Sequence, residues 1–372
     1  MIGTRTRSHT MRVASTVVAA SAVATSTLAC TSRPIQPPAR HVFVINLENK
    51  GFATTFGTNA APYLSQTLRK QGVLLDQYHG TAHNSLPNYL AQISGQGPNP
   101  QQQADCQVFT PFVGTGPVAA HQQAVGDGCV YPSSVPTLAG QLRSKGRSWK
   151  GYMEDMGNDP TRESATCGRP TLGLPDGTQT ATKTDSYAAR HDPFVYFQSI
   201  GAADCHARVV NLRRLQTDLA ATATTPNLSY ITPSLCHDGH DTPCADGEPG
   251  GLTSADAFLR TWVPRIQNSP AFKKDGLLVI TFDESDSPLS DATASGGEMP
   301  GPNSPLSGIT GPGGGRVGAV VLSRWTRAGT TSHTGYNHYS LLASIEDVFG
   351  LPRLGFAGQA GLPRFGRDVY SS

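Results

Sequence analysis

The sequence has few charged residues: Asp, Glu, Lys and Arg make up 15% of its 372 residues, and the formal net charge is +2. A nucleic-acid-binding surface normally carries a marked excess of Lys and Arg, so the composition gives no support to that class of function. Cys-x-x-Cys spacing is also absent, which argues against a thiolate metal site. The chain is long enough, with 37% hydrophobic residues, to bury a sizeable core.

A long apolar run near the N-terminus is missing as well. Residues 13–28 form a stretch rich in Ala, Val, Ser and Thr that is too short and too polar for a good membrane span. Three basic residues precede it: Arg5, Arg7 and Arg12. This pattern is typical of an export signal. We therefore expect an exported protein, either extracellular or anchored to the outer face of the cell membrane.

The expected domain boundaries follow from this signal. A small residue before Cys30 resembles a bacterial lipobox, although the usual Leu three places before the Cys is absent. Lipidation of Cys30 and cleavage nearby without a lipid both remain open. We expect a signal over residues 1–30, a Pro-rich tether over 31–40 and a catalytic domain over 41–372.

The other cysteines form an even set of six, which in an exported protein favours disulfides. Sequential pairing would tie down one loop with each bridge. The expected pairs are Cys106–Cys129, Cys167–Cys205 and Cys236–Cys244.

Apolar runs alternate with helical periodicity after the tether. Two runs, 41–47 and 276–282, are almost continuously apolar, which is typical of strands buried on both faces of a parallel sheet. Further strands are expected at 72–78, 149–153, 227–231 and 316–322, helices at 61–71, 86–93, 135–145, 255–268 and 339–349, and loops at 96–131 and 287–315. No internal repeat is visible. We predict an α/β layered fold with a largely parallel central sheet and helices on both faces.

Polar side chains follow four of the expected strands. These strand ends carry Glu48 and Asn49, His83 and Ser85, the segment 237–241, and Asp283 and Glu284. Sites in open α/β sheets form beyond the carboxyl ends of the strands, so these groups are expected to converge, although each cluster taken singly fits a solvated turn. Carboxylate and amide oxygens suit a divalent cation, and a hydroxyl at a helix start suits attack on a phosphate ester.

Three segments occur in the order of a known family: NLENK at 46–50, HNSLPNYL at 83–90 and TFDE at 281–284. They resemble the bacterial phosphoesterase family of secreted acid phosphatases and phospholipases C, within the alkaline phosphatase superfamily. PSLCHDGHD at 233–241, and NHY at 337–339 followed by GLP at 350–352, resemble its mycobacterial secreted acid phosphatase branch. The resemblance runs from residue 41 to about 355 and implies an alkaline-phosphatase-like fold.

The resemblance also implies roles for individual residues. A divalent metal ion would be held by Glu48, Asn49, Ser85, Asp283 and Glu284. Ser85 would be the nucleophile, and Asn88 would donate a hydrogen bond to a phosphoryl oxygen. Asn84 departs from the family, because relatives often have Pro at that position.

Histidines around this centre have two interpretations. Asp238, His240 and His338 occupy positions where two-metal members of the superfamily bind a second ion. Because Asp-x-His differs from the Asp-x-x-x-His spacing of those members, we favour one metal, with His240 and His338 acting on phosphate and leaving group. His191 lies in a further family-like segment, 190–194, and is expected near the phosphate.

Several alternatives stay open at the level of sequence. Ser85 also fits the N-cap of the following helix, and His83 fits packing or a hydrogen-bond bridge. The favoured function is hydrolysis of small phosphate monoesters through a phosphoserine, with Thr81 as the alternative nucleophile. A phospholipase C-like diesterase acting on lipid head groups and a non-catalytic phosphate-binding lipoprotein are the other candidates. A serine hydrolase is disfavoured because Ser85 lacks the Gly-x-Ser-x-Gly context.

Overall fold

The computed structural model describes residues 1–7, 36–286, 295–308 and 312–371. The chain divides into two units, residues 1–34 and 35–372, and the helices and strands below belong to the second. Most of the predicted signal, the candidate lipidation site Cys30, the first half of the tether and part of the loop 287–315 lie outside the described residues. Among the residues that are described, no helix is both long and apolar enough to cross a membrane.

The second unit contains an eight-stranded sheet with the order β11-β2-β10-β9-β1-β8-β6-β7. Its strands are β1 His41–Leu47, β2 Val73–Leu75, β6 Trp149–Met153, β7 Val209–Asn211, β8 Leu228–Thr232, β9 Gly276–Phe282, β10 Ala319–Ser323 and β11 Thr330–Ser332. Neighbouring strands are parallel except where β10 pairs antiparallel with β9 and β2. The predicted α/β class with a largely parallel sheet is confirmed.

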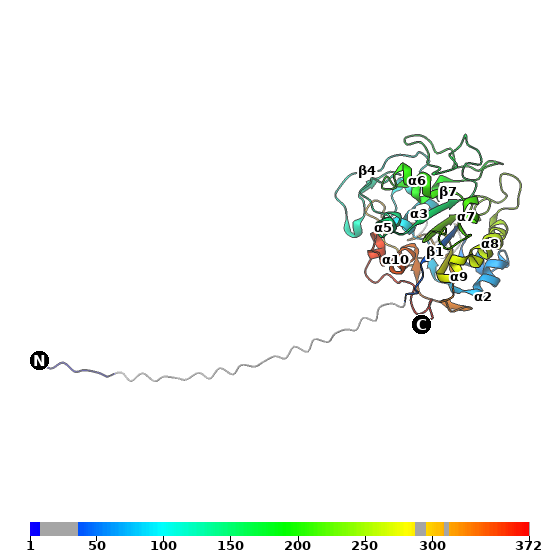
Figure 1. Cartoon of the computed structure of the whole chain (residues 1–372). Coiled ribbons are helices and arrows are strands. Elements are labelled where there is room, and N and C mark those ends of the chain that lie inside the picture. Colours follow the sequence, from blue (N-terminus) through cyan, green and yellow to red (C-terminus); the bar gives the residue numbers. More distant parts are fainter. Residues whose placement is uncertain (8–35, 287–294, 309–311, 372) are drawn as a thin grey trace. The chain divides into compact units, whose positions relative to one another are not determined.

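Helices flank this sheet (Figure 1). The α-helices are α1 Phe52–Phe56, α2 Arg69–Gln71, α3 Ser85–Ser94, α4 Pro100–Gln103, α5 Leu138–Ser144, α6 Ala202–Arg208, α7 Arg213–Asp218, α8 Gly251–Asn268, α9 Pro270–Asp275 and α10 His338–Phe349. Shorter turns are the π-helix η1 Tyr63–Leu68 and the 3-10 helices η2 Ala120–Gln122, η3 Ala189–His191, η4 Pro193–Tyr196 and η6 Gly355–Gly358. Helices α3, α5 and α10 pack against one another, and α8 contacts α9 and η1.

The central strands form where the sequence is most continuously apolar. All seven residues of β1 and all seven of β9 are buried, because helices cover both faces of the sheet. Helix α10 begins with a capping box in which Asn337 and Ser340 bond to each other's backbone amides. Helix α3 ends at Gly95, whose φ of +68° is in the left-handed region that glycine adopts readily.

The observed elements differ from the expected ones mainly at short strands. The strand expected over 72–78 is divided into β2 and β3 Tyr78–His79, because β3 pairs with β12 Tyr336–Asn337 in a separate small sheet. A further two-stranded sheet, β4 Val113–Gly114 with β5 Gly126–Asp127, lies within the segment expected to be a loop. The three-residue strands β7 and β11 were not expected, since a three-residue run carries no readable periodicity.

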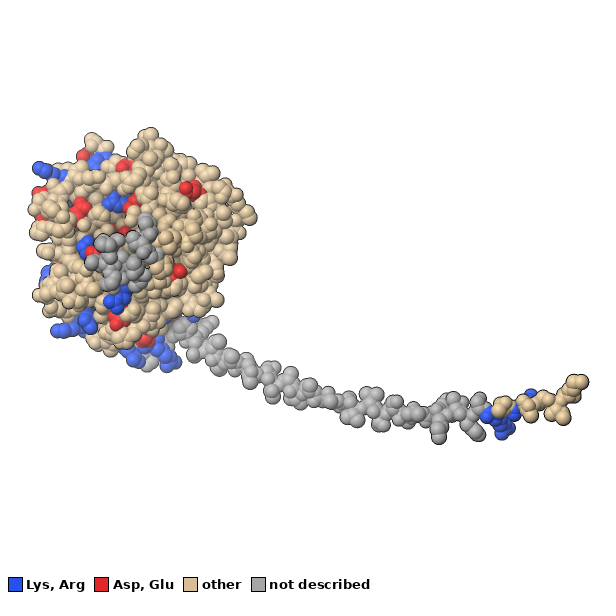
Figure 2. All heavy atoms as spheres, turned by 180° about the vertical axis from the view of Figure 1, so that it is seen from behind, with Lys and Arg blue, Asp and Glu red and all other residues tan. Residues whose placement is uncertain are grey.

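All three predicted disulfides are confirmed: Cys106–Cys129, Cys167–Cys205 and Cys236–Cys244. Each closes a loop segment outside the central strands. On the face that Figure 2 shows, Lys and Arg are interspersed with Asp and Glu among uncharged residues. That face therefore carries no continuous basic patch of the kind that binds nucleic acid.

Candidate active site

The carboxyl ends of three neighbouring strands bring acidic residues together. Strands β1 and β9 run in register with Leu47 opposite Phe282, so the residues that follow them, Glu48 and Asp283, lie side by side. The Asn49 amide donates to Asp283 Oδ1 at 3.0 Å. The loop after β8 joins them, because the Glu48 amide donates to the Asp238 carbonyl at 2.9 Å.

Gly239 permits the close approach of the loop after β8 to Glu48. Gly239 has φ of +113°, and a Cβ at this position would lie 2.9 Å from the carbonyl oxygen of Glu48. Both the backbone conformation and the space therefore favour glycine between Asp238 and His240.

Ser85 lies at the first position of α3 and directs its hydroxyl at this cluster. Its Oγ donates to Glu48 Oε2 at 2.9 Å, and the side chain is buried. Asn84 is the N-cap residue of α3 and makes no side-chain cap bond, so the alternative reading of Ser85 as the N-cap is wrong. One helical turn later, the Tyr89 hydroxyl donates to Glu48 Oε1. Helix α3 thus supplies a donor to each oxygen of Glu48.

The carboxylates of this cluster are buried and repel one another. Burial, followed by repulsion from Asp283 and Asp238, raises the pKa of Glu48 well above its usual value. Burial and then repulsion from Glu284 raise the pKa of Asp283, a rise that the Ser85 hydroxyl opposes. Burial raises the pKa of Asp238 to about 7. In the described part of the chain no Lys or Arg forms an ion pair with Glu48, Asp238 or Asp283.

His191 lies between two of these carboxylates. Its Nε2 is 3.3 Å from Glu48 Oε1 and its Nδ1 is 3.3 Å from Asp238 Oδ2. The imidazole stacks on the Tyr89 ring, with centroids 5.2 Å apart. Burial, with smaller contributions from Arg190 and His240, lowers the pKa of His191 well below its usual value, so the ring is neutral and able to act as a ligand.

These groups fit a divalent cation. Among the described residues, three groups of His, Cys, Asp or Glu lie close enough to share an ion, and two of them include Cys236, whose sulfur is in a disulfide. The third is Glu48, His191 and Asp238, all buried. Asp238 Oδ2 and Asp283 Oδ2 are buried and accept no hydrogen bond from the described residues. Buried carboxylates that repel one another and keep an unused oxygen are the donor set that a hard cation takes.

Two members of the predicted metal set make other contacts. Glu284 Oε2 pairs with His83 Nδ1, so His83 takes the second of its two expected roles, a hydrogen-bond bridge. The Asn49 side chain accepts a bond from Lys50 Nζ at 3.3 Å, while its main chain contacts Asp283. The structure therefore joins Glu48, Ser85 and Asp283 directly, and adds His191, for which no ligand role was expected.

Asn88 departs from its expected role. Its Oδ1 accepts bonds from the amides of Thr81 and Ala82, at 2.8 and 3.0 Å, and its Nδ2 donates to the carbonyls of Ala82 and Asn84, at 2.9 and 3.0 Å. Both amide hydrogens are thus engaged by the turn that leads into α3. In this structure Asn88 supports the turn before Ser85 and has no hydrogen left to donate to a phosphoryl oxygen.

His338 also makes its contacts within the protein. Its Nε2 donates to the Asp283 carbonyl at 2.5 Å, and its Nδ1 accepts from Tyr78 and Gln92 at 3.0 and 3.1 Å. Burial lowers the pKa of His338 to about 4, so the ring is neutral. Both ring nitrogens are thus engaged within the protein in this structure, and its expected role on the leaving group or at a second metal stays a prediction.

His240 reaches Asp238 through its backbone only. The His240 amide donates to Asp238 Oδ1 at 2.7 Å, whereas the imidazole Nδ1 faces Asp241 Oδ1 at 2.8 Å. The two-residue spacing brings the His240 amide onto the carboxylate, while the ring faces Asp241. In this structure His191 is the histidine whose ring lies beside the Asp238 carboxylate, and the second ion considered for Asp238, His240 and His338 stays a prediction.

Three residues near the site were not singled out from the sequence. Tyr89 lies four residues after Ser85 and was detectable as its neighbour on one helical face. Arg190 precedes His191 in the family-like segment and is buried. Asp105 accepts a bond from the Leu86 amide at 3.0 Å, a contact that only the tertiary fold creates.

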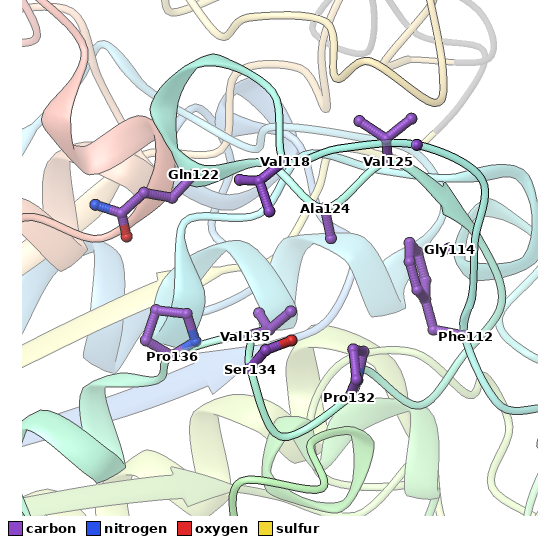
Figure 3. A pocket seen from close by; sticks show the side chains of 11 residues that line it. Phe112, Gly114, Val118, Gln122, Ala124, Val125, Pro132, Ser134, Val135 and Pro136 are labelled. Carbon is purple, nitrogen blue, oxygen red and sulfur yellow. The ribbon is translucent and has the colours of Figure 1, made fainter.

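A cavity of about 440 Å³ adjoins this cluster and has Arg190 and His240 in its wall. A separate apolar pocket of about 400 Å³ lies between residues 112–125 and 132–136 (Figure 3). There Val118 and Ala124 face Ser134 and Val135. None of its lining residues belongs to the acidic cluster, so the apolar pocket is not part of the site.

Comparisons with known proteins agree with the motifs. The chain is 27% identical over 289 residues to a phosphate-repressible acid phosphatase of Penicillium chrysogenum, covering 77% of this chain and 54% of that protein. It is 24% identical over 329 residues to a phosphatidylinositol-3-phosphatase of Mycobacterium tuberculosis, covering 87% of this chain and 81% of that protein. The chain thus spans about half the length of the fungal relative.

Among solved structures, a protein in the alkaline phosphatase superfamily from Vibrio parahaemolyticus superposes with a TM-score of 0.47 at 11% sequence identity, covering 86% of this chain and 68% of that one. Residues 58–352 match the phosphoesterase family. This range includes Ser85, Asp238, Asp283 and His338 and spans most of the chain. The chain therefore belongs to the phosphoesterase family.

Proposed function

We propose that this chain is an exported, metal-dependent phosphatase that hydrolyses phosphate monoesters through a phosphoserine at Ser85. One observation carries the proposal. The Ser85 hydroxyl, at the N-terminus of α3, donates to the buried Glu48 carboxylate, which forms no ion pair with Lys or Arg among the described residues. A helix N-terminus favours an incoming phosphate, and a hydroxyl bonded to a carboxylate is placed to lose its proton.

A divalent ion would be held by Glu48, Asp283 and Ser85, with His191 and Asp238 as the neighbouring donors. When bound, such an ion would neutralise phosphoryl oxygens and lower the pKa of the Ser85 hydroxyl. His338 would keep Asp283 in place through its carbonyl, and Asn88 would hold the turn that presents Ser85.

The reaction has two balanced steps. Ser85 Oγ attacks phosphorus, its proton passes toward Glu48 Oε2, and the bond between phosphorus and the ester oxygen breaks. The departing alkoxide takes a proton, for which His240, the more exposed histidine of the site, is the candidate donor. Water then attacks the phosphoserine and gives a proton to His240, the phosphorus–Oγ bond breaks, and Ser85 Oγ takes back the proton from Glu48, which releases inorganic phosphate and restores the serine hydroxyl.

The relatives and the disulfides support this assignment. An acid phosphatase and a phosphatidylinositol-3-phosphatase are both named for hydrolysis of monoesters. Three disulfides are typical of a protein that folds in an oxidising compartment.

The test compares release of phosphate from p-nitrophenyl phosphate and its bis ester by metal-loaded protein. We expect turnover of the monoester, loss of turnover after chelation, and no turnover by Ser85→Ala. Ser94→Ala is the matched control, since Ser94 lies in the last turn of α3 and bonds only within its own segment.

Each other outcome has a defined meaning. Full activity of Ser85→Ala would move the nucleophile, with Thr81 as the next candidate. Preference for the bis ester would make the protein a diesterase. No hydrolysis with any divalent ion from acid to alkaline pH would leave phosphate binding without turnover.

A further inference from the structure

Arg190 is a buried cation that forms no ion pair with a carboxylate among the described residues. Its side chain belongs to η3 and the residue is 5% exposed. Nη1 donates to the Gln179 carbonyl at 2.9 Å and to Gln179 Oε1 at 3.4 Å. Within the described part of the chain, no carboxylate forms an ion pair with it, and no hydrogen bond engages its Nε or Nη2. A buried charge is normally compensated, so the guanidinium is prepared for an anion that comes from outside.

The guanidinium borders the cavity of about 440 Å³ beside the acidic cluster. That volume is in the usual range of small-molecule sites, roughly 300–1,000 Å³. The rest of the described wall combines polar side chains with aliphatic ones such as Leu235 and Pro243, and it includes the Asp241 carboxylate, which faces His240 Nδ1. The hydroxyl and amide groups of Gln179, Thr180 and Thr242 beside a single arginine suit a hydroxylated anion better than an acyl chain.

The cavity lies next to the place where the ester bond would break. His240, in the cavity wall, has its ring centroid 6.2 Å from that of His191, and His191 contacts Glu48. Arg190 is near enough to lower the pKa of Glu48 and of Asp105, yet it pairs with neither. An ester whose phosphoryl group meets Ser85 would therefore extend its leaving group along His240 toward Arg190.

We propose that this cavity is the leaving-group subsite and that Arg190 binds a second anionic group on the leaving group. The preferred substrates are then phosphate monoesters of small polyols that carry another phosphate. This inference rests on the proposed phosphatase function and adds the class of substrate.

The test measures kcat/KM of metal-loaded protein on a matched pair: a hexose 6-phosphate, whose leaving group is neutral, and the corresponding hexose 1,6-bisphosphate. A charge-assisted contact predicts a preference for the bisphosphate on the order of 10- to 100-fold. Arg190→Met should abolish the preference while the hexose 6-phosphate is still hydrolysed.

A second variant keeps Arg190 in place, because Arg190 also supports Gln179 and its removal can disturb the loop. Thr180 is exposed in the cavity wall, so Thr180→Asp introduces a competing anion without altering the core. We expect this variant to lose the preference and Thr180→Asn to retain it.

Several results would overturn the subsite. Wild-type protein that hydrolyses both substrates within a factor of two has no second-anion site. Equal slowing of both substrates in Arg190→Met, with the preference intact, would place Arg190 on the transferred phosphoryl group instead.

Failure of the phosphatase function is recognised separately, by absence of hydrolysis of either hexose phosphate and of p-nitrophenyl phosphate. Calorimetry with the hexose bisphosphate then tests whether the subsite exists without turnover. Binding that is weakened in Thr180→Asp supports the subsite, and absence of binding refutes it.

Discussion

At the scale of single residues, Glu48 organises the site. Its two carboxylate oxygens take hydrogen bonds from Ser85 and Tyr89, and His191 lies 3.3 Å from one of them. Burial is the largest cause of the raised pKa of this carboxylate, and no Lys or Arg among the described residues forms an ion pair with it. By contrast, the side-chain nitrogen and oxygen atoms of Asn88 and His338 are hydrogen-bonded to other groups of the protein.

Substitution of Asn88 distinguishes support of the turn from contact with substrate. Asn88→Ala leaves the buried amides of Thr81 and Ala82 without their acceptor, so we expect the free energy of unfolding to fall by about 3 kcal/mol. Urea unfolding measures this loss. A variant of unchanged stability with a higher KM would instead restore the phosphoryl-binding role that the sequence suggested.

At the scale of elements, α3 is held at its N-terminus by a loop distant in sequence. Asn84 gives no side-chain cap, and Asp105 takes its place by accepting from the Leu86 amide. The neighbouring disulfide Cys106–Cys129 ties down this acidic residue beside the N-terminus of the helix, where the proposed phosphate would bind. A carboxylate at this point stabilises the helix but repels phosphate.

Asp105→Asn keeps an acceptor oxygen for Leu86 and removes the charge. We expect inorganic phosphate, as a product inhibitor, to bind about two- to five-fold more tightly at low ionic strength. Inhibition constants for the variant and for wild-type protein give the answer. An unchanged constant would reduce Asp105 to a helix cap.

The loop after β8 has its own pH-dependent contact. His237 Nδ1 is 3.0 Å from Glu154 Oε2, and this bond, opposed by burial and aided by Glu248, raises the pKa of His237 to about 9. Because the folded value exceeds the unfolded one, the stabilisation is complete below pH ~6.5 and is lost as the pH rises through about 9.

His237→Gln should therefore flatten the pH dependence of unfolding. The side chain is 34% exposed, so solvent screening reduces the effect, and we expect wild-type protein to lose about 1 kcal/mol more than the variant between pH ~6 and ~9.5. Urea titrations at both pH values measure the difference. Parallel curves for the two proteins would show that the pair contributes nothing.

At the scale of the whole molecule, the three disulfides stabilise loops that surround a sheet already well buried. The separations between bonded cysteines are 38 residues for Cys167–Cys205, 23 for Cys106–Cys129 and 8 for Cys236–Cys244. Longer closed loops restrict the unfolded chain more.

Paired Cys→Ala variants should follow this order. Removing Cys167–Cys205 is expected to lower the free energy of unfolding by about 1 kcal/mol more than removing Cys236–Cys244. The latter closes the loop that carries Asp238 and His240, so its removal should reduce kcat disproportionately. Equal loss of activity from all three variants would show that the bridges act on global stability alone.

The sequence by itself determined the central architecture. Continuous apolar runs at β1 and β9 indicate strands buried on both faces in the middle of a largely parallel sheet, and the parallel pairing of β1 with β9 brings Glu48 and Asp283 to the same edge. Sequential pairing of the even set of cysteines, expected because each bridge would close one loop, matches the observed disulfides. Residue types and strand ends are local properties of the chain, so a sequence pattern can predict them.

Only the tertiary structure decided how the side chains at that edge are used. Whether His338 faces Asp283 or substrate, and whether Asn88 serves the turn or a ligand, depends on neighbours that are remote in sequence. The same holds for Arg190, whose significance lies in the absence of an ion-pairing carboxylate among the described residues. Whether a polar group forms a hydrogen bond depends on distances of a few ångströms in three dimensions, and spacing along the chain does not encode those distances.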